Sequence, residues 1–206
     1  MSESGLSPFE STARIHAHLG FFAFLVGLPL GILISRYLRT FINHWFWPHA
    51  IVNFLFTGPL VFATIALGHQ AVQKSGGRHF DDVHERIGLA LLLLYLLQFF
   101  LGVFIHSIKF PSLNARIPGG RSPQNYLHAI LGLTTVLLAC WQTHYGLWYE
   151  WAKATGNAHP VNWRCKHFWL GIVVAFWALY VVGLGLLPRQ YKQEAQGRTE
   201  KGKMLV

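Results

Sequence analysis

The chain has 206 residues, of which 52% are hydrophobic and only 12% are charged, and its formal net charge is +9. A soluble domain carries about 25% charged residues, so this composition excludes an ordinary water-soluble surface and indicates a membrane protein. The Lys and Arg residues fall between apolar runs and not along one stripe, which indicates membrane topology and no nucleic-acid partner. The two cysteines stand at no metal-type spacing, and without a C-x-x-C-H sequence covalent attachment of a c-type haem is excluded.

The predicted elements begin after a short polar N-terminus, residues 1–13, which lacks the basic and small-residue signals of a secretory leader. Residues 14–187 form a membrane domain, and the charged tail, 188–206, is expected to be disordered. Long stretches without Asp, Glu, Lys or Arg follow one another, and about 20 apolar residues are enough to cross a bilayer as a helix. The sequence therefore predicts an all-α membrane protein with five transmembrane helices, at residues 14–37, 46–71, 82–108, 124–150 and 164–187.

The charges of the loops predict the orientation of these helices. We name the face that holds the N-terminus side A and the opposite face side B. By sequence position, side A collects seven Lys and Arg residues and side B collects ten. The positive-inside rule places side B and the C-terminus in the cytoplasm. The N-terminus then faces the exterior or a lumen, so the protein belongs to the plasma membrane or an endomembrane.

Histidine is the main ionisable residue inside the predicted helices. The chain has 12 histidines, and no Asp, Glu, Lys or Arg lies deep in any predicted span. A single histidine is typically an interfacial or packing residue, but intramembrane ionisable groups in such number indicate function. A proton relay would be expected to bring a carboxylate, and the spans offer none. One histidine opens each of the first four helices: His16, His49, His84 and His128.

Helix direction sorts these four histidines into two pairs. The first and third helices start on side A, so His16 and His84 lie at similar depth, and the same argument places His49 and His128 together on side B. Two imidazoles that face each other in an apolar bundle form an axial site for haem iron. The sequence therefore predicts two non-covalent haem b groups in a four-helix bundle of helices 1–4.

Two other histidines compete for the side A site. The fifth helix also starts on side A, so His167 could pair with His84 in place of His16. His18 is about 200° around the helix from His16, so only one of these two can face the bundle.

A glycine follows three of the four histidines at the fourth position and shares their helix face. The expected role of these glycines is to leave a gap one turn below the ligand, where a flat macrocycle can approach the backbone; close helix packing is the alternative. The second helix breaks the pattern with Asn53. The three glycines are Gly20, Gly88 and Gly132.

The motifs of these helices together resemble the cytochrome b561 family. "HAHLGFFAFLVGLPLGILISRYL" is similar to its first core helix, and "DDVHERIGLALLLLYLLQFFLG" to the helix that begins with Ser-Leu-His-Ser-Trp. "YLHAILGLTTVLLACWQTHYGLWYE" is similar to its His-x-x-x-Gly-Leu helix. With "WFWPHAIVNF", the resemblance covers about residues 13–150. It implies axial pairs His16 with His84 and His49 with His128, which leaves His167 without a ligand role.

The resemblance also implies a function: a di-haem transmembrane oxidoreductase that carries single electrons from a cytoplasmic, ascorbate-like donor to monodehydroascorbate, a ferric chelate or a protein on the other side. Asp-Val-His-Glu-Arg replaces Ser-Leu-His-Ser-Trp here, and the paired lysines of the ascorbate-dependent branch are absent. The resemblance is closer to the branch found with DOMON domains. Alternatives are a haem-bearing anchor subunit of a larger oxidoreductase, or a His-lined transporter without haem. The protein could act as a homodimer.

Residues near the helix ends are candidates for contact with donor and acceptor. His69 ends the second helix on side A, near the His16–His84 pair, and the family resemblance implies a histidine at a similar place. His69 is therefore predicted to help form the acceptor site; the alternative is an interfacial histidine without a role. On side B, cations near the second pair are candidates to bind haem propionates or an anionic donor. The alternative is that they only set the orientation of the helices in the membrane. These side B residues are Arg36, Arg39, His44 and Arg121.

Overall fold

The computed structural model describes residues 5–108 and 122–203, without the side chains of residue 198 and of residues 200–203. Throughout this part of the chain the regular structure is helical, with no strand. Five helical segments are long and apolar enough to cross a membrane, which confirms the predicted number. These spans are Pro8–Thr40, Phe46–Ser75, Val83–Ser107, Pro123–Ala154 and Trp163–Leu184.

Three spans contain a wide π-helical turn, a feature that is frequent at functional sites. The first span consists of α1 (Pro8–Phe21), the wide turn η1 (Phe22–Gly27), α2 (Leu28–Tyr37) and η2 (Leu38–Thr40). The second consists of α3 (Phe46–Ile51), η3 (Val52–Thr57) and α4 (Gly58–Ser75). The others are α5 (Val83–Ser107); α7 (Pro123–Tyr145), η5 (Gly146–Glu150) and α8 (Trp151–Ala154); and α9 (Trp163–Leu184), which is followed by α10 (Leu187–Lys203).

The first helix begins earlier than its hydrophobic run because polar residues cap it. Ser7 and Glu10 form a reciprocal capping box, in which the Ser7 amide donates to Glu10 Oε2 at 2.7 Å and the Glu10 amide donates to Ser7 Oγ at 3.2 Å. Pro8 occupies the first helical turn, where its missing N–H costs nothing. Part of the N-terminus that the sequence assigns to a polar lead, residues 1–13, is therefore the start of α1.

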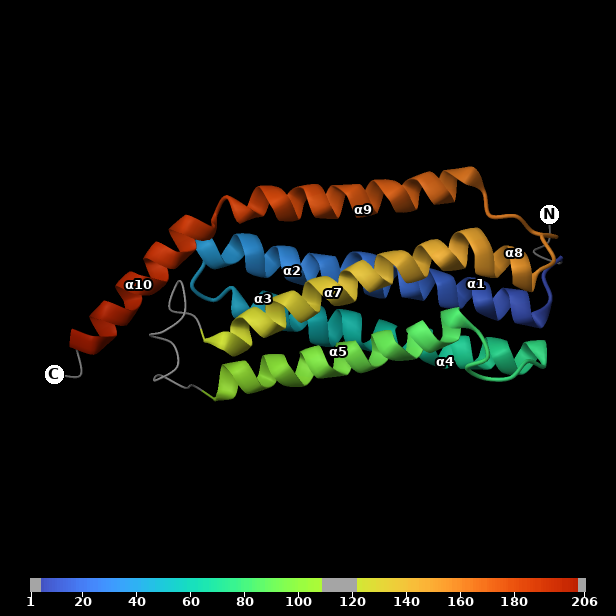
Figure 1. Ribbon diagram of the computed structural model, residues 1–206, viewed down its shortest axis with the longest axis horizontal. Coiled ribbons are helices and arrows are strands. Elements are labelled where there is room, and N and C mark those ends of the chain that lie inside the picture. The colour runs from blue at the N-terminus through green and yellow to red at the C-terminus, as the bar shows by residue number, and fades with distance from the viewer. Residues whose placement is uncertain (1–4, 109–121, 204–206) are drawn as a thin grey trace.

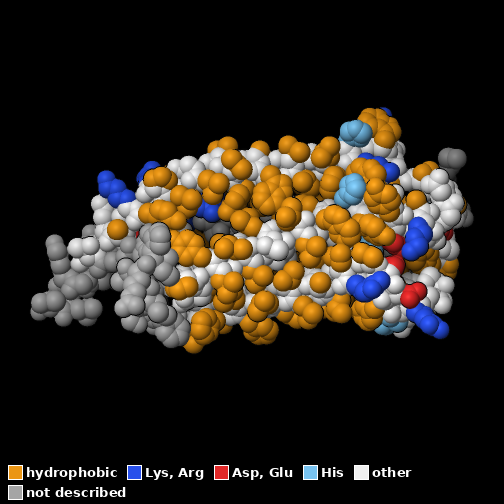
Figure 2. Space-filling model, viewed as in Figure 1, with side chains coloured by type: hydrophobic (Ala, Val, Ile, Leu, Met, Phe, Trp, Pro, Cys, Tyr) orange, Lys and Arg blue, Asp and Glu red, His pale blue; other side chains and the backbone are white. Residues whose placement is uncertain are grey.

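The first four spans pack together and the fifth lies outside them. α1 packs along α4, α5 packs along α7, and α9 packs along α2 and against side chains of η1 and α7 (Figure 1). All four inner spans contribute side chains to one buried cluster, which includes Ala23, Val61, Leu91 and Ala139. Hydrophobic side chains cover the visible flank of the molecule, and charged side chains gather at its ends (Figure 2). This distribution fits a helical bundle that is surrounded by lipid.

The sequence analysis expects the C-terminal tail, 188–206, to be disordered. The structure differs, because the helix α10 extends through Lys203. Gln190 anchors this helix to the end of the first span: its amide donates to the Arg36 carbonyl and to Thr40 Oγ1, both at 2.7 Å. Gln193 donates to the Thr40 carbonyl at 3.2 Å. Gln, Glu, Lys and Ala favour the helix locally, and the anchor fixes its start. α10 projects from the bundle on side B (Figure 1).

Candidate functional site: two histidine pairs

On side A the structure places His16 of α1 beside His84 of α5. Their ring centroids are 6.0 Å apart and their planes make an angle of 69°. An imidazole nitrogen binds a metal at about 2.0 Å and lies about 1 Å from its ring centre, so two axial histidines hold their ring centres about 6 Å apart. The observed separation therefore fits two imidazoles on opposite sides of one metal ion.

On side B the structure places His49 of α3 beside His128 of α7, with nearly the same geometry. These centroids are 6.4 Å apart and the planes make an angle of 71°. Both pairs join one helix of the first two spans to one helix of the next two. The structure thus brings together the two pairs that the sequence analysis selects, and the haem-binding role of these pairs stays a prediction.

One histidine of each pair has its tautomer fixed by a backbone carbonyl. His16 Nδ1 lies 2.7 Å from the Thr64 carbonyl oxygen, and His49 Nδ1 lies 2.8 Å from the Gly31 carbonyl oxygen. A carbonyl oxygen only accepts, so each Nδ1 carries the hydrogen. Nε2 is then the nitrogen with a lone pair, and it is the one able to bind a metal.

The second histidine of each pair is held through its backbone carbonyl, which accepts a hydrogen bond from a glutamine side chain on the neighbouring helix. The Gln142 amide donates to the His84 carbonyl at 2.6 Å, and the Gln98 amide donates to the His128 carbonyl at 2.8 Å. The Nδ1 atoms of His84 and His128 are buried and have no hydrogen-bond partner. Buried polar atoms without a partner are uncommon and cost about 1–3 kcal/mol each.

Three glycines that the sequence analysis does not select let these rings approach a neighbouring helix. A Cβ atom at Gly68 would lie 3.0 Å from His16 Cε1, and one at Gly146 would lie 3.2 Å from His84 Cε1. A Cβ atom at Gly102 would lie 3.3 Å from His128 Cε1. Real Cβ atoms rarely come so close, so a side chain at any of these positions would displace the histidine ring.

The three predicted glycines have polar neighbours in this structure. Gly132 faces the Gln98 amide and Gly88 faces the Gln142 amide, at 2.6 Å and 3.7 Å from the Cβ that each glycine lacks. Gly20 faces Thr64 Cγ2 at 3.2 Å. Gly132 and Gly88 therefore admit the glutamine side chains that reach the histidine carbonyls, and Gly20 admits Thr64. The approach of a macrocycle to these glycines stays a prediction.

A repeat of 44 residues in the sequence marks the residues that single motifs miss. The spacing of His84, Gly88, Gln98 and Gly102 on α5 recurs as His128, Gly132, Gln142 and Gly146. Because α5 and α7 are antiparallel neighbours, the glutamine of each helix meets the histidine carbonyl of the other. The first two spans are related by a spacing of 33 residues, which separates His16 from His49 and Gly31 from Thr64. The Thr64 carbonyl accepts from His16, and the Gly31 carbonyl accepts from His49.

The competing histidines do not enter either pair. His18 is exposed, and its Nδ1 lies 2.7 Å from the Arg14 carbonyl oxygen of its own helix. His167 is exposed as well, with Nδ1 2.9 Å from the Trp163 carbonyl oxygen and its ring against the Trp163 ring. Both side chains thus turn back on their own helices, which favours His16 as the partner of His84.

The predicted side B cations are dispersed by the fold. Arg36 faces α9, where its guanidinium donates to the Tyr180 hydroxyl at 2.9 Å and lies over the Tyr180 ring. Arg39 pairs with Glu194 of α10 at 2.8 Å. His44 is exposed in the link between the first two spans, and Arg121 lies outside the described residues. Arg36 therefore links α2 to α9, and it does not face the region where an electron donor is expected.

On side A, His69 is exposed near the end of α4, next to Gly68, which contacts the His16 ring. Its ring stacks on that of His79, with centroids 4.0 Å apart and planes within 7°. The sequence analysis does not select His79, which lies in the following loop. The two rings form an imidazole pair at the surface of the side A site.

No family model, no curated protein and no solved structure matches this chain. Among the described residues, no group of three or more His, Cys, Asp or Glu side chains could hold a bare metal ion. Each histidine pair therefore offers two ligands from the protein.

Proposed function

We propose that the chain is a di-haem b-type transmembrane electron-transfer protein of the cytochrome b561 type. The observation that supports this most is the duplicated pair geometry: centroid separations of 6.0 Å and 6.4 Å, one pair toward each side of a bundle of apolar spans. A coincidental contact between two histidines would not be expected twice with the same separation and the same plane angle.

The donor set favours haem over a bare metal ion. A structural zinc site uses four protein ligands and a catalytic one uses three, whereas each pair here supplies two imidazoles. Haem iron needs only axial ligands from the protein, because its macrocycle supplies the other four. Bound haems would supply one-electron chemistry at the two positions.

The protein's own residues would hold and insulate such groups. The Thr64 and Gly31 carbonyls fix the tautomers of His16 and His49, which keeps each Nε2 free to bind. The cluster that includes Leu91 lies between the sites along α5, where 14 residues separate His84 from Gln98, or about 21 Å of helix. These apolar side chains exclude water from the middle of the bundle.

The charges at the two ends favour electron flow from side B to side A. By sequence position, side B has ten Lys and Arg against two Asp and Glu, whereas side A has seven against six. Under the positive-inside rule side B is cytoplasmic. A basic face raises the encounter rate of an anionic reductant. The donor is thus an anionic molecule on side B, and the acceptor is on side A.

The experiment is a reduced-minus-oxidised absorption spectrum of the purified protein, followed by a redox titration. The wild type is expected to show a b-type spectrum that titrates in two steps. His84→Ala and His128→Ala should each leave one step, and a different one. His167→Ala is the matched control and should keep both, because its ring contacts its own helix. A protein without a haem spectrum, or histidine variants that titrate like the wild type, would refute the proposal.

A further inference from the structure

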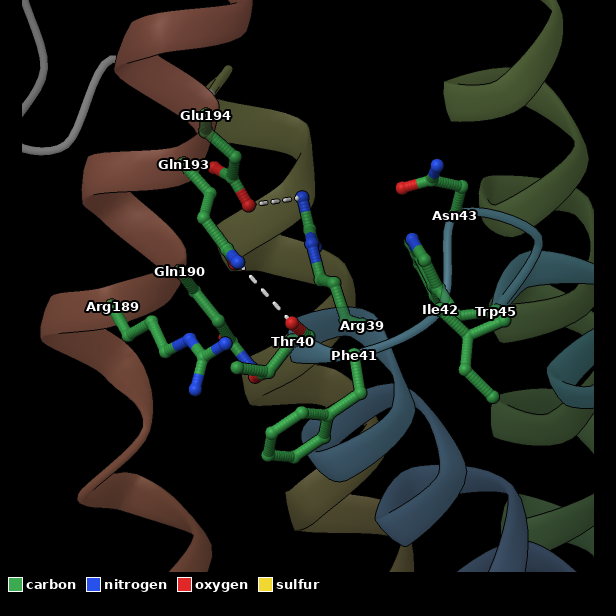
Figure 3. Close-up of a pocket in the computed structure, with 10 residues that line it drawn as sticks. All are labelled: Arg39, Thr40, Phe41, Ile42, Asn43, Trp45, Arg189, Gln190, Gln193 and Glu194. Carbon is green, nitrogen blue, oxygen red and sulfur yellow. Dashed lines mark hydrogen bonds and ion pairs between the residues drawn. The ribbon is translucent and has the colours of Figure 1, made fainter.

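A cavity of about 500 Å³ lies on side B, between α10 and residues 39–45, where the first span ends and the link to the second begins (Figure 3). We call it the side B pocket. From α10 it is lined by Arg189, Gln193 and Glu194, from the end of the first span by Arg39, and from the link by Asn43, among others. None of these side chains belongs to a histidine pair.

The polar groups of the side B pocket favour an anionic ligand. Arg39 forms an ion pair of 2.8 Å with Glu194, the one carboxylate among the residues that line the pocket. Arg189 adds a second cation, which makes no ion pair with a described carboxylate. Asn43 and Gln193 add neutral amide donors. The lining thus has a net charge of +1, and guanidinium groups are the side chains best suited to bind phosphate.

The position of the pocket selects the source of that anion. Thr40 is the last residue of the first span, so the cavity lies where the apolar spans meet the water on side B. Its rim includes Phe41, of which 61% is exposed, and Ile42, of which 45% is exposed. The Arg189 guanidinium lies 5.1 Å from the centre of the Phe41 ring. Arginine combined with exposed apolar and aromatic side chains is typical of the headgroup layer of a membrane.

We propose that the side B pocket binds the phosphate headgroup of an anionic phospholipid, with Arg189 and Arg39 as its charged contacts. Phe41 and Ile42 then contact the glycerol and the upper acyl chain. A free phosphate shares the headgroup chemistry, but it gains nothing from these exposed apolar side chains. Since the pocket joins α10 to the first span, the bound lipid holds the C-terminal helix against the bundle. This role needs no haem and is separate from electron transfer.

Native mass spectrometry of the full chain in detergent, titrated with phosphatidylglycerol or phosphatidylcholine, tests this site. The wild type is expected to retain phosphatidylglycerol about fivefold better, and Arg189→Gln should lose most of that preference, because one interfacial cation contributes about a fivefold change in binding. Arg164→Gln is the matched control: Arg164 also lies over an aromatic ring, Trp163 at 5.8 Å, but on side A. It should bind like the wild type.

Glu194→Gln separates a ligand site from a merely structural one. Removal of the one carboxylate raises the net charge of the lining, so phosphatidylglycerol binding should strengthen, whereas a structural role for the Arg39–Glu194 ion pair predicts a loss. Glycerol phosphate should compete only weakly; competition at equal concentration would overturn the lipid assignment in favour of a free phosphate. Equal retention of both lipids, or an Arg189→Gln variant that binds like the wild type, would overturn the site itself.

Discussion

The two ends of the bundle hold histidine pairs of nearly the same geometry in very different electrostatic surroundings. Each pair has one histidine fixed by a carbonyl and one whose own carbonyl accepts from a glutamine. By sequence position, however, nearly all of the net positive charge lies on side B. The exposed ring pair of His69 and His79 lies on side A, and the pocket with two arginines lies on side B. The repeated helix faces therefore place the two histidine pairs, and the helix ends determine the charges that surround each pair.

The largest expected effect comes from filling the space beside one histidine. Gly146→Leu should remove the side A haem and Gly102→Leu the side B haem, because the new Cβ would lie 3.2 Å or 3.3 Å from the ring Cε1. Each variant should bind about one haem instead of two, measured by haem content against protein. Gly171→Leu is the control: Gly171 also follows a histidine by four residues, but no atom of a neighbouring helix lies within 4 Å of its Cβ position. If both glycine variants kept two haems, the placement of the rings would be wrong.

A smaller effect is expected from the two glutamines. Gln142→Leu leaves the His84 carbonyl without its donor, and Gln98→Leu does the same to the His128 carbonyl. A buried acceptor without a partner costs about 1–3 kcal/mol, so each variant should lose its own haem at a lower temperature than the wild type. Thermal titration monitored at the Soret band measures this. Loss of the same haem in both variants would contradict the side-specific assignment.

The acceptor site should respond to His69 and not to its counterpart on the other side. His69→Ala removes half of the stacked pair and should slow oxidation by an external acceptor about two- to tenfold, the equivalent of one hydrogen bond, with unchanged spectra. His106→Ala is the control, because His106 stacks on Phe46 at 3.8 Å near the side B pair. Stopped-flow oxidation measures both. Equal slowing in the two variants would remove His69 from the acceptor site.

The smallest effect is the dependence of reduction on salt. Reduction by an anionic donor such as ascorbate should slow about threefold between low and physiological ionic strength, because the Debye length falls from about 30 Å to about 8 Å. Arg36→Gln should leave this dependence unchanged, since Arg36 faces Tyr180. Reduction that ignores ionic strength would indicate a neutral donor or a protein donor.

The sequence predicts the number of spans and both histidine pairs, because each depends on a simple regularity. Charge-free runs define the spans, and helix direction places His49 with His128 and either His16 or His167 with His84. The family resemblance selects His16, which is the histidine found beside His84. The start of α1 is missed, since a capping box extends the helix into a polar segment. α10 is missed because Gln190 gains its partners, Arg36 and Thr40, from the far end of the chain.

The side chains that support the histidines are harder to predict than the histidines themselves. Gln142 and Gly146 lie some 60 residues from His84 in sequence, and only the packing of α7 against α5 brings them together. The repeat of 44 residues gives a signal for them, but its meaning depends on knowing that these two helices are neighbours. Arg36 is a residue that the sequence analysis selects but that the structure places elsewhere. The side chain of a cation at a helix end faces the helix that packs there, and for Arg36 that helix is α9.

The ratio of haem to protein tests the central claim most directly. A pyridine haemochrome assay on the purified full-length chain, with protein measured by amino-acid analysis, is expected to give two b-type haems per chain, all of them extractable by acid–acetone. A ratio of one would mean that only one of the two histidine pairs binds haem. A ratio of zero would contradict the proposed function at both sites.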